Sequence, residues 1–347
     1  METWKRTVYI SLVCVFCTAF GVSQLAPILP LYFHDLGVQT PEAMSLWSGL
    51  ATGATYIIVC LAAPFWGRVA DKKGRKITLI RSSFGMALCN ILIAFQTTPE
   101  GVVLIRLIQG LVSGFYSASI TLIASESPIE RTGWALGLLA SANLAGSLIG
   151  PLLGGYIADT VGIRNDFIIV GTLMGLAGVL ATIFIHENYV PQPNPEKLSI
   201  RKLKEQIPEF NSIVALCVAS FIYAICIMSL QPVISVYIKG IVPSDTENLA
   251  FIAGAVFSAM GIAQLMSSSP LGKLVDKIGP RKVLVVSLIY VGILNIPQAY
   301  VSDVYQLAII RFLQGFGLGG MLPALNTYLS SKTPREFTGQ VFSYNQS

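Results

Sequence analysis

The sequence predicts an all-α integral membrane protein with about ten full spans and the start of an eleventh. Three observations carry this prediction: an apolar composition, a series of long apolar runs, and a repeat within the chain. Of 347 residues, 53% are hydrophobic and 12% are charged, and the mean hydropathy is +0.67. Soluble domains carry about 25% charged residues, so this chain has too little charge to cover a surface in water.

Ten apolar runs are long enough to span a membrane, which requires about 20 mostly apolar residues. The predicted spans are 7–33, 46–66, 77–97, 102–124, 133–157, 167–186, 212–238, 249–270, 283–301 and 305–329. An eleventh begins near Gly339 and is cut off by the chain end. The longest polar segment predicts a cytoplasmic linker at 187–211, between an N-terminal six-helix bundle at 1–186 and an incomplete C-terminal bundle at 212–347.

The first apolar run could belong to a signal peptide, because it follows Lys5 and Arg6. It continues to about Phe33 without a cleavage pattern, so we predict the first span instead. Cys14 and Cys17 have the spacing of a metal or redox pair. No His or Asp accompanies them in the run, and small apolar filler is the better interpretation. We expect no cofactor and no metal.

Basic residues are distributed unevenly between the two sides of the predicted membrane. Of the 23 Lys and Arg, eighteen lie on the side of the N-terminus, two on the opposite side, and three within spans. Cytoplasmic loops carry such an excess. We therefore predict a multi-pass protein of the plasma or inner membrane with a cytoplasmic N-terminus. Topology explains the net charge of +5, so no nucleic-acid partner is expected.

Two motifs recur with a constant offset of 205 residues. The charged stretch GRVADKKGRK at 67–76 matches GKLVDKIGPRK at 272–282, and RLIQG at 106–110 matches RFLQG at 311–315. One offset that relates two motifs and the distance between them indicates a duplicated unit of about six spans. Because that number is even, both copies have the same orientation, as in a parallel repeat.

The charged stretch at 67–76 resembles the signature between spans two and three of the major facilitator superfamily. RLIQGLVSG at 106–114 resembles its fourth-span motif, and APILPLYF at 26–33 fits its first-span proline pair. GSLIGPLLGG at 146–155 is similar to the fifth-span motif of the twelve-span drug:proton antiporters. The resemblance covers the whole chain. It implies the major facilitator fold, with two six-helix bundles related by a pseudo-two-fold axis, and the activity of a multidrug efflux branch. With fewer than twelve spans, the chain looks C-terminally truncated.

The charged stretch is predicted to form a conformational latch. Its members are Gly67, Asp71, Gly74 and Arg75, together with Asp276 in the second copy. The glycines should let the loop turn tightly, and Asp71 should complement the dipole of the next helix. The resemblance implies that Asp71 also contacts the opposite half and holds the cytoplasmic side shut. The alternative is a loop that only fixes topology, and Pro280 departs from the pattern in the second copy.

Polar and small side chains share one face of the fourth predicted span. Arg106 heads this face, and an Arg inside a span costs roughly 2.5–3.5 kcal/mol, so we expect it to avoid lipid. The predicted cavity and coupling residues are Arg106, Gln109, Ser113 and Ser117, with Arg311, Gln314 and Asn326 in the tenth span and Gln24 in the first. The alternative is an Arg that braces two helices through backbone carbonyls.

Glycines recur every four positions in the fifth predicted span. Gly146, Gly150 and Gly154 share one face, Gly155 lies beside it, and Pro151 kinks the helix. We predict a tight seam between the two halves that flexes during transport. The alternative is ordinary packing between membrane helices.

The acidic residues do not identify a proton carrier. None of the 18 is placed in the middle of a predicted span, and Asp166 is assigned to the outer face. Asp35 and Glu126, at span ends, are weak candidates. Proton coupling therefore follows from the resemblance alone.

We predict a monomeric secondary transporter that exports amphipathic small molecules, coupled to protons, by alternating access. A uniporter or symporter for a sugar or metabolite is the alternative among carriers. A membrane-embedded enzyme or a receptor is the alternative of another class. The chain shows no nucleotide-binding glycine loop and no cluster with metal-ligand spacing, so we do not expect an enzyme.

Overall fold

The computed structural model describes residues 3–187, 207, 209–243, 246–333 and 341. Over these residues the regular secondary structure is helical, and ten helical segments are long and apolar enough to cross a membrane. Each corresponds to one predicted span, so the all-α membrane class is confirmed. The predicted eleventh span and most of the predicted linker lie outside the described residues.

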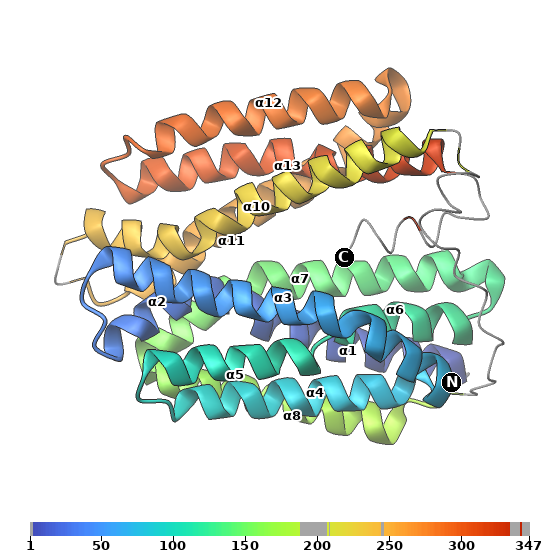
Figure 1. Cartoon of the computed structure of the whole chain (residues 1–347), viewed down its shortest axis with the longest axis horizontal. Coiled ribbons are helices and arrows are strands. Elements are labelled where there is room, and N and C mark those ends of the chain that lie inside the picture. The colour runs from blue at the N-terminus through green and yellow to red at the C-terminus, as the bar shows by residue number, and fades with distance from the viewer. Residues whose placement is uncertain (1–2, 188–206, 208, 244–245, 334–340, 342–347) are drawn as a thin grey trace. The chain divides into compact units, whose positions relative to one another are not determined.

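The helices follow the chain from blue to red in Figure 1. They are α1 (Thr3–Ser23), α2 (Leu25–Asp35), α3 (Pro41–Lys73), α4 (Arg75–Ala94), α5 (Pro99–Val112), α6 (Phe115–Glu126), α7 (Ile129–Val161), α8 (Ile163–Phe184), α10 (Phe210–Ile241), α11 (Leu249–Ile278), α12 (Pro280–Gln298) and α13 (Val304–Lys332). The first predicted span thus comprises α1 and α2, and the fourth comprises α5 and α6.

Capping residues set the starts of α3 and α5 ahead of their apolar runs. Thr40 accepts a hydrogen bond from the backbone N–H of Ala43, and Thr98 accepts one from Gly101, each at 3.3 Å. A proline follows each threonine at the first helical position. Both features stabilise helix starts, so these helices begin earlier than hydropathy alone predicts.

The charged stretch at 67–76 is helical apart from one residue. α3 continues through Lys73, Gly74 has a φ of +92°, and α4 begins at Arg75. A single residue in this left-handed region reverses the chain, which glycine permits without strain. Gly67, which we expected to help the turn, instead lies within α3.

The second copy of the stretch has the same geometry. Gly279, with a φ of +91°, separates α11 from α12. Gly272, the counterpart of Gly67, lies within α11. The 205-residue offset therefore relates backbone conformation as well as sequence.

The fourth span is interrupted, whereas its sequence predicts one continuous run. α5 ends at Val112, Gly114 has a φ of +110°, and α6 begins at Phe115. Ending a helix leaves its last carbonyl groups without partners in the same helix. In a bilayer such groups must be satisfied within the protein.

Arg81 of α4 and Trp66 of α3 supply the missing donors. The Arg81 guanidinium donates to the carbonyl oxygens of Ser113 at 2.8 Å and Leu111 at 3.3 Å. The Trp66 indole N–H donates to Leu111 at 2.7 Å. The guanidinium carbon lies 3.5 Å from the centroid of the Trp66 ring, a cation–π distance. These two side chains thus stabilise the end of α5, where a positive charge also suits the helix dipole.

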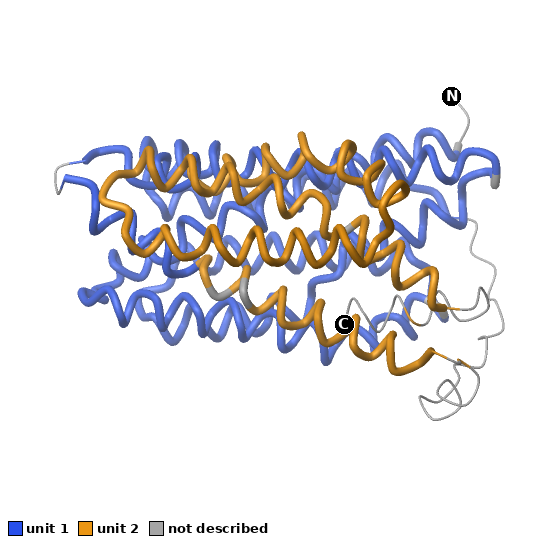
Figure 2. The backbone as a smooth tube through the Cα atoms, turned by 90° about the horizontal axis from the view of Figure 1, so that it is seen from above, with its two compact units in different colours: residues 1–193, 232–255 blue, residues 194–231, 256–347 orange. Residues whose placement is uncertain are grey.

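The chain forms two compact units, coloured blue and orange in Figure 2. The first comprises residues 1–193 and 232–255, and the second comprises 194–231 and 256–347. The end of α10 and the first turns of α11 therefore pack with the N-terminal helices. The division at 187–211 that the sequence suggests stays a prediction.

Each unit has its own apolar core. In the first unit, Tyr32 and Phe33 of α2 pack with Phe167 of α8, and a second cluster joins α1, α6, α7 and α8. In the second unit, α10, α11, α12 and α13 contribute, with Leu318 and Met321 among the buried side chains. Many large apolar side chains remain exposed, as expected of surfaces that face lipid.

We expect Gly114→Ala to destabilise the protein by about 1–2 kcal/mol, because a side chain in the left-handed region is strained. A Cβ there would meet no atom closer than 3.8 Å, so the cost comes from φ rather than from a clash. Thermal unfolding of the purified protein in detergent measures the effect. Gly137→Ala, in the interior of α7 with open space around it, is the control and should not lower the melting temperature. Equal behaviour of the two variants would contradict the prediction.

Candidate functional site

The fourth and tenth spans each bury an arginine that contacts the glutamine one turn further on. Arg106 is 6% exposed, and its Nη1 donates to Gln109 Oε1 at 2.6 Å. Arg311 is 4% exposed, and its Nη1 donates to Gln314 Oε1 at 3.4 Å. The structure therefore brings together the predicted pairs in both copies. A buried Arg held by a neutral amide retains its positive charge, which is available to a polar partner.

The second-copy arginine belongs to a wider amide network. Gln314 Nε2 donates to Asn295 Oδ1 of α12 at 2.9 Å. Gln298 Nε2, also of α12, lies 3.3 Å from Gln314 Oε1. On its other side, Arg311 Nη1 lies 3.6 Å from the sulfur of Met260 in α11. This network joins three helices of the second unit, as expected of a buried polar group that must be hydrogen-bonded.

The other predicted cavity residues are less buried. Ser113 is half-buried at the break in span four, and Ser117 and Asn326 are exposed. Gln24 is fully buried at the joint between α1 and α2. Ser113 and Ser117 therefore lie beyond the buried Arg106–Gln109 pair, and Gln24 belongs to a separate group of contacts.

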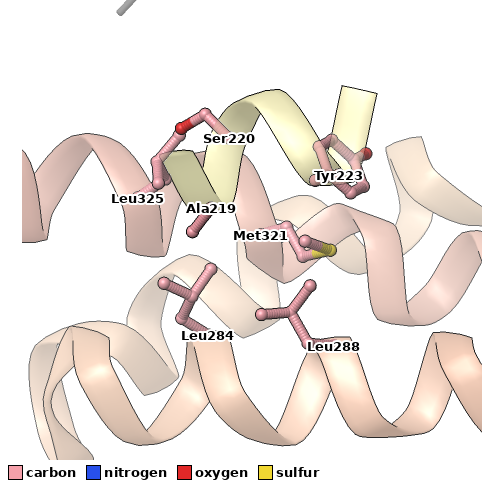
Figure 3. Close-up of a pocket in the computed structure, with 7 residues that line it drawn as sticks. All are labelled: Ala219, Ser220, Tyr223, Leu284, Leu288, Met321 and Leu325. Carbon is pink, nitrogen blue, oxygen red and sulfur yellow. The ribbon is translucent and has the colours of Figure 1, made fainter. Parts of the chain in front are cut away.

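A small pocket in the second unit lies between α10, α12 and α13 (Figure 3). Its lining residues are Ala219, Ser220, Tyr223, Leu284, Leu288, Met321 and Leu325. Its volume of about 20 Å³ holds roughly one water molecule. It is therefore too small for a drug-sized molecule, for which pockets of about 300–1,000 Å³ are typical.

The glycine face of α7 packs against α1. A Cβ on Gly146 would lie 2.5 Å from the carbonyl oxygen of Phe16, and one on Gly150 would lie 2.6 Å from that of Phe20. A Cβ on Gly154 would lie 2.6 Å from the Cβ of Gln24. Each glycine therefore permits an approach between helices that alanine would prevent. These contacts lie within the N-terminal helices, whereas we expected this face at the seam between halves.

Another face of α7 meets the start of α11 within the first unit. A Cβ on Gly155 would lie 2.6 Å from the carbonyl carbon of Ala250 and 2.9 Å from the Cα of Phe251. A Cβ on Gly254 would lie 2.6 Å from the carbonyl carbon of Pro151. The two helices thus approach each other through glycines on both sides. The predicted seam between the halves, with Pro151 and Gly155, stays a prediction.

Asp159 reinforces this contact from α7. Its carboxylate accepts hydrogen bonds from the backbone N–H groups of Ala250 at 3.1 Å and Phe251 at 2.7 Å. These are first-turn groups of α11, which have no acceptor in their own helix. The rings of Tyr156 and Phe251 also contact each other edge to face, with centroids 6.3 Å apart. A carboxylate at a helix start is favoured by the dipole.

Glu187, which the sequence did not single out, caps the start of α4. Its two oxygens accept hydrogen bonds from the backbone N–H groups of Arg75 and Lys76, each at 2.8 Å. Its Oε1 is also 4.0 Å from Nη1 of Arg75. The chain just after α8 therefore holds the turn at Gly74 in place. In the predicted latch, the side chain of Asp71 lies outside the described residues, and Asp276 is exposed.

Asp166 is the buried acid that sequence reasoning missed. It was assigned to the outer face, and it does lie in the first turn of α8, but it is 0% exposed. The helical period contained the signal: Asp166 shares a face with Val170, Met174 and Ala177, all fully or almost fully buried. Asp166 lies at the edge of the apolar run, and its position along the run alone does not indicate that it is buried. Within the described ranges, no three His, Cys, Asp or Glu side chains gather at metal-binding distance.

A comparison with known families agrees with this architecture. The sequence profile of the Major Facilitator Superfamily matches residues 11–241 and 216–347. The chain belongs to this superfamily of membrane transporters. It is 38% identical over 344 residues to the multidrug resistance protein MdtG of Salmonella dublin, and 39% identical to MdtG of Dickeya zeae. These matches cover 99% of this chain and 85% and 84% of the relatives. The resemblance seen in the motifs is thereby confirmed.

Solved structures show the same fold at low identity. A bacterial homologue of the human lysosomal transporter Spinster aligns with a TM-score of 0.75 at 13% identity, covering 99% of this chain and 80% of the other. The nucleoside transporter NupG aligns with a TM-score of 0.76 at 13% identity, covering 99% and 87%. The major facilitator fold is therefore confirmed, and the chain is a multi-pass transporter of small molecules.

We expect Gly254→Ala to destabilise the protein by about 1–3 kcal/mol, because the new methyl group would collide with the backbone of Pro151. Thermal unfolding in detergent provides the measurement. Gly272→Ala is the matched control in the same helix, where no atom lies within 4 Å of the added Cβ. An unchanged melting temperature for Gly254→Ala would show that α7 and α11 do not approach each other in this way.

We expect Glu187→Gln to destabilise the protein by about 1–2 kcal/mol. An amide offers one acceptor oxygen, so one of the two backbone N–H groups at the start of α4 loses its partner. Chemical denaturation in detergent can measure this difference. Glu100→Gln is the control, because Glu100 is an exposed acid in the first turn of α5, which Thr98 already caps. Similar losses for both variants would indicate a general charge effect instead of a cap.

Proposed function

We propose that this chain exports amphipathic small molecules, drugs among them, in exchange for protons. The observation that carries this proposal is the 38% identity, over 99% of the chain, to proteins named multidrug resistance protein MdtG. The excess of basic residues on the side of the N-terminus supports an inner or plasma membrane location with a cytoplasmic N-terminus. A single chain supplies both copies of the repeat, which supports action as a monomer.

Alternating access is the mechanism that the repeated architecture supports. Two copies with equivalent buried arginines and equivalent glycine turns suit a transporter whose halves rock around one site. The turn at Gly74, capped by Glu187, would position Asp71 as the latch on the cytoplasmic side. Asp276 would act at the equivalent turn of the second copy, beside Gly279. The glycine contacts between α7 and α11 would form the flexing seam.

The buried arginines favour substrates with acceptor groups. Arg106 Nε, Arg311 Nε and Arg311 Nη2 are buried without a hydrogen-bond partner in the described chain. An unpaired buried donor is costly, so a carbonyl or anionic oxygen of a substrate would be stabilised beside it. Neutral or anionic amphiphiles should therefore be transported better than permanent cations. The alternative is a uniporter or symporter for a sugar or metabolite.

We expect inside-out vesicles that contain the protein to accumulate radiolabelled chloramphenicol, a neutral amphipathic drug, when their interior is acidic. One-for-one exchange with protons permits up to about tenfold accumulation per pH unit. Nigericin, which collapses the pH gradient, should reduce the accumulation to that of vesicles without the protein. Ethidium, a permanent cation, should compete poorly.

The alternatives give different results in the same assay. A uniporter would equilibrate chloramphenicol without responding to the gradient, and a symporter would accumulate it when the gradient is reversed. A carrier for sugars would leave chloramphenicol at the level of empty vesicles. Any of these outcomes would contradict proton-coupled efflux.

A further inference from the structure

The first unit contains a buried acid–amide pair. Gln24 Nε2, at the joint between α1 and α2, donates to Asp166 Oδ2 of α8 at 3.1 Å. Both residues are 0% exposed. Asp166 Oδ1 and Gln24 Oε1 are also buried, and neither has a hydrogen-bond partner among the described residues. The carboxyl group thus has one neutral donor and one unpaired oxygen.

This arrangement fits the protonated acid better than the carboxylate. An ionised carboxylate buried with a single neutral donor is costly, because charges in such sites are normally paired and fully hydrogen-bonded. A proton on Asp166 Oδ1 removes the charge and turns an unpaired acceptor into a donor. A primary amide carries N–H donors beside an acceptor oxygen and so complements a carboxylic acid. Gln24 Oε1 is such an acceptor, without a partner among the described residues.

No cation compensates the charge of Asp166 in the described part of the chain. The titratable side chains at this end of the surrounding helices are Tyr32, His34 and Asp35 of α2, Cys89 of α4, Asp159 of α7 and Arg164 of α8. Three of these groups have other partners. The Tyr32 hydroxyl donates to the carbonyl oxygen of Ile93 at 2.7 Å. Arg164 donates to the carbonyl oxygen of Gln96, and Asp159 caps the start of α11. His34 lies 3.8 Å from Asp35. Gln24 is therefore the polar partner of Asp166 that the structure shows.

A glycine of α7 and the joint between α1 and α2 leave space for this pair. A Cβ on Gly154 of α7 would lie 2.6 Å from the Cβ and 3.0 Å from the Cδ of Gln24. The glycine therefore makes room for the Gln24 side chain. The backbone bonds at the joint are long, at 3.3 Å from Gln24 N to Phe20 O and 3.4 Å from Ile28 N to Gln24 O. A change at Gln24 thus acts at the joint between the two helices of the first span.

We propose that Asp166 is the residue that binds and releases the coupling proton, with Gln24 as its positioning residue. In the conformation described here, the proton is held on the carboxyl group. When the joint between α1 and α2 opens the pair to water, the proton leaves to the aqueous phase and the carboxylate is solvated. This proposal rests on the proton-coupled export proposed above.

The test uses protein reconstituted in liposomes and radiolabelled chloramphenicol. The wild type should accumulate the drug about tenfold per pH unit. Asp166→Asn should abolish accumulation driven by the gradient while still equilibrating the drug down its own gradient. Asp166→Glu should restore part of the accumulation. Glu100→Gln is the matched control, an exposed acid that should behave as the wild type.

Two outcomes distinguish an error in the proposed proton site from an error in the proposed proton-coupled export. If the wild type responds to the pH gradient and Asp166→Asn responds equally, the site is wrong but proton-coupled export stands. If the wild type ignores the gradient, proton coupling fails and this proposal fails with it. Loss of both coupled and downhill transport in a correctly inserted Asp166→Asn would indicate a structural role and would also overturn the proposal.

Infrared spectroscopy gives a readout that does not depend on transport. The wild type should show the carbonyl band of a protonated carboxylic acid that disappears at high pH, is absent in Asp166→Asn and is shifted in Asp166→Glu. Adding chloramphenicol to the wild type in weakly buffered detergent should release protons, and Asp166→Asn should release none. If Asp166→Asn does not insert, the band in the wild type and its shift in Asp166→Glu decide the question. Absence of such a band at all pH values would overturn the proposal.

Discussion

Every backbone group that a break in a membrane helix sets free must find its partner within the protein. This constraint explains why a cation from the third span lies at the break in the fourth. Arg81 and the indole of Trp66 together satisfy the carbonyl groups of Leu111 and Ser113. Without these donors, each carbonyl would cost several kcal/mol in hydrocarbon. The break therefore depends on side chains from two neighbouring helices.

The same constraint acts at the helix ends of the first unit. Asp159 of α7 satisfies the first N–H groups of α11, and Glu187 satisfies those of α4. In each case a carboxylate far away in the sequence completes a helix start. Helix ends that are tied to other helices move with them, which suits the alternating access proposed above.

The sequence predicts the fold well because each span is a local property. Ten apolar runs correspond to ten membrane-length segments, and the 205-residue offset correctly relates Arg106–Gln109 to Arg311–Gln314. The break at Gly114 was not predicted, because the apolar run continues through it and its donors come from other spans. The partners of the glycines in α7 were also not predictable, because spacing identifies a face but not the helix that covers it.

Asp166 shows how a local interpretation can fail at a buried polar position. Its place at the start of an apolar run predicts exposure, yet three elements remove it from water: α8 carries it, the joint of the first span supplies Gln24, and Gly154 of α7 leaves room for that side chain. Replacing any one of these would change the surroundings of the carboxyl group. The glycine motif of α7 therefore has a chemical consequence besides close packing. It allows an amide from the first span to reach a buried acid, and in the proposed mechanism it would couple the protonation of that acid to the geometry of two helices.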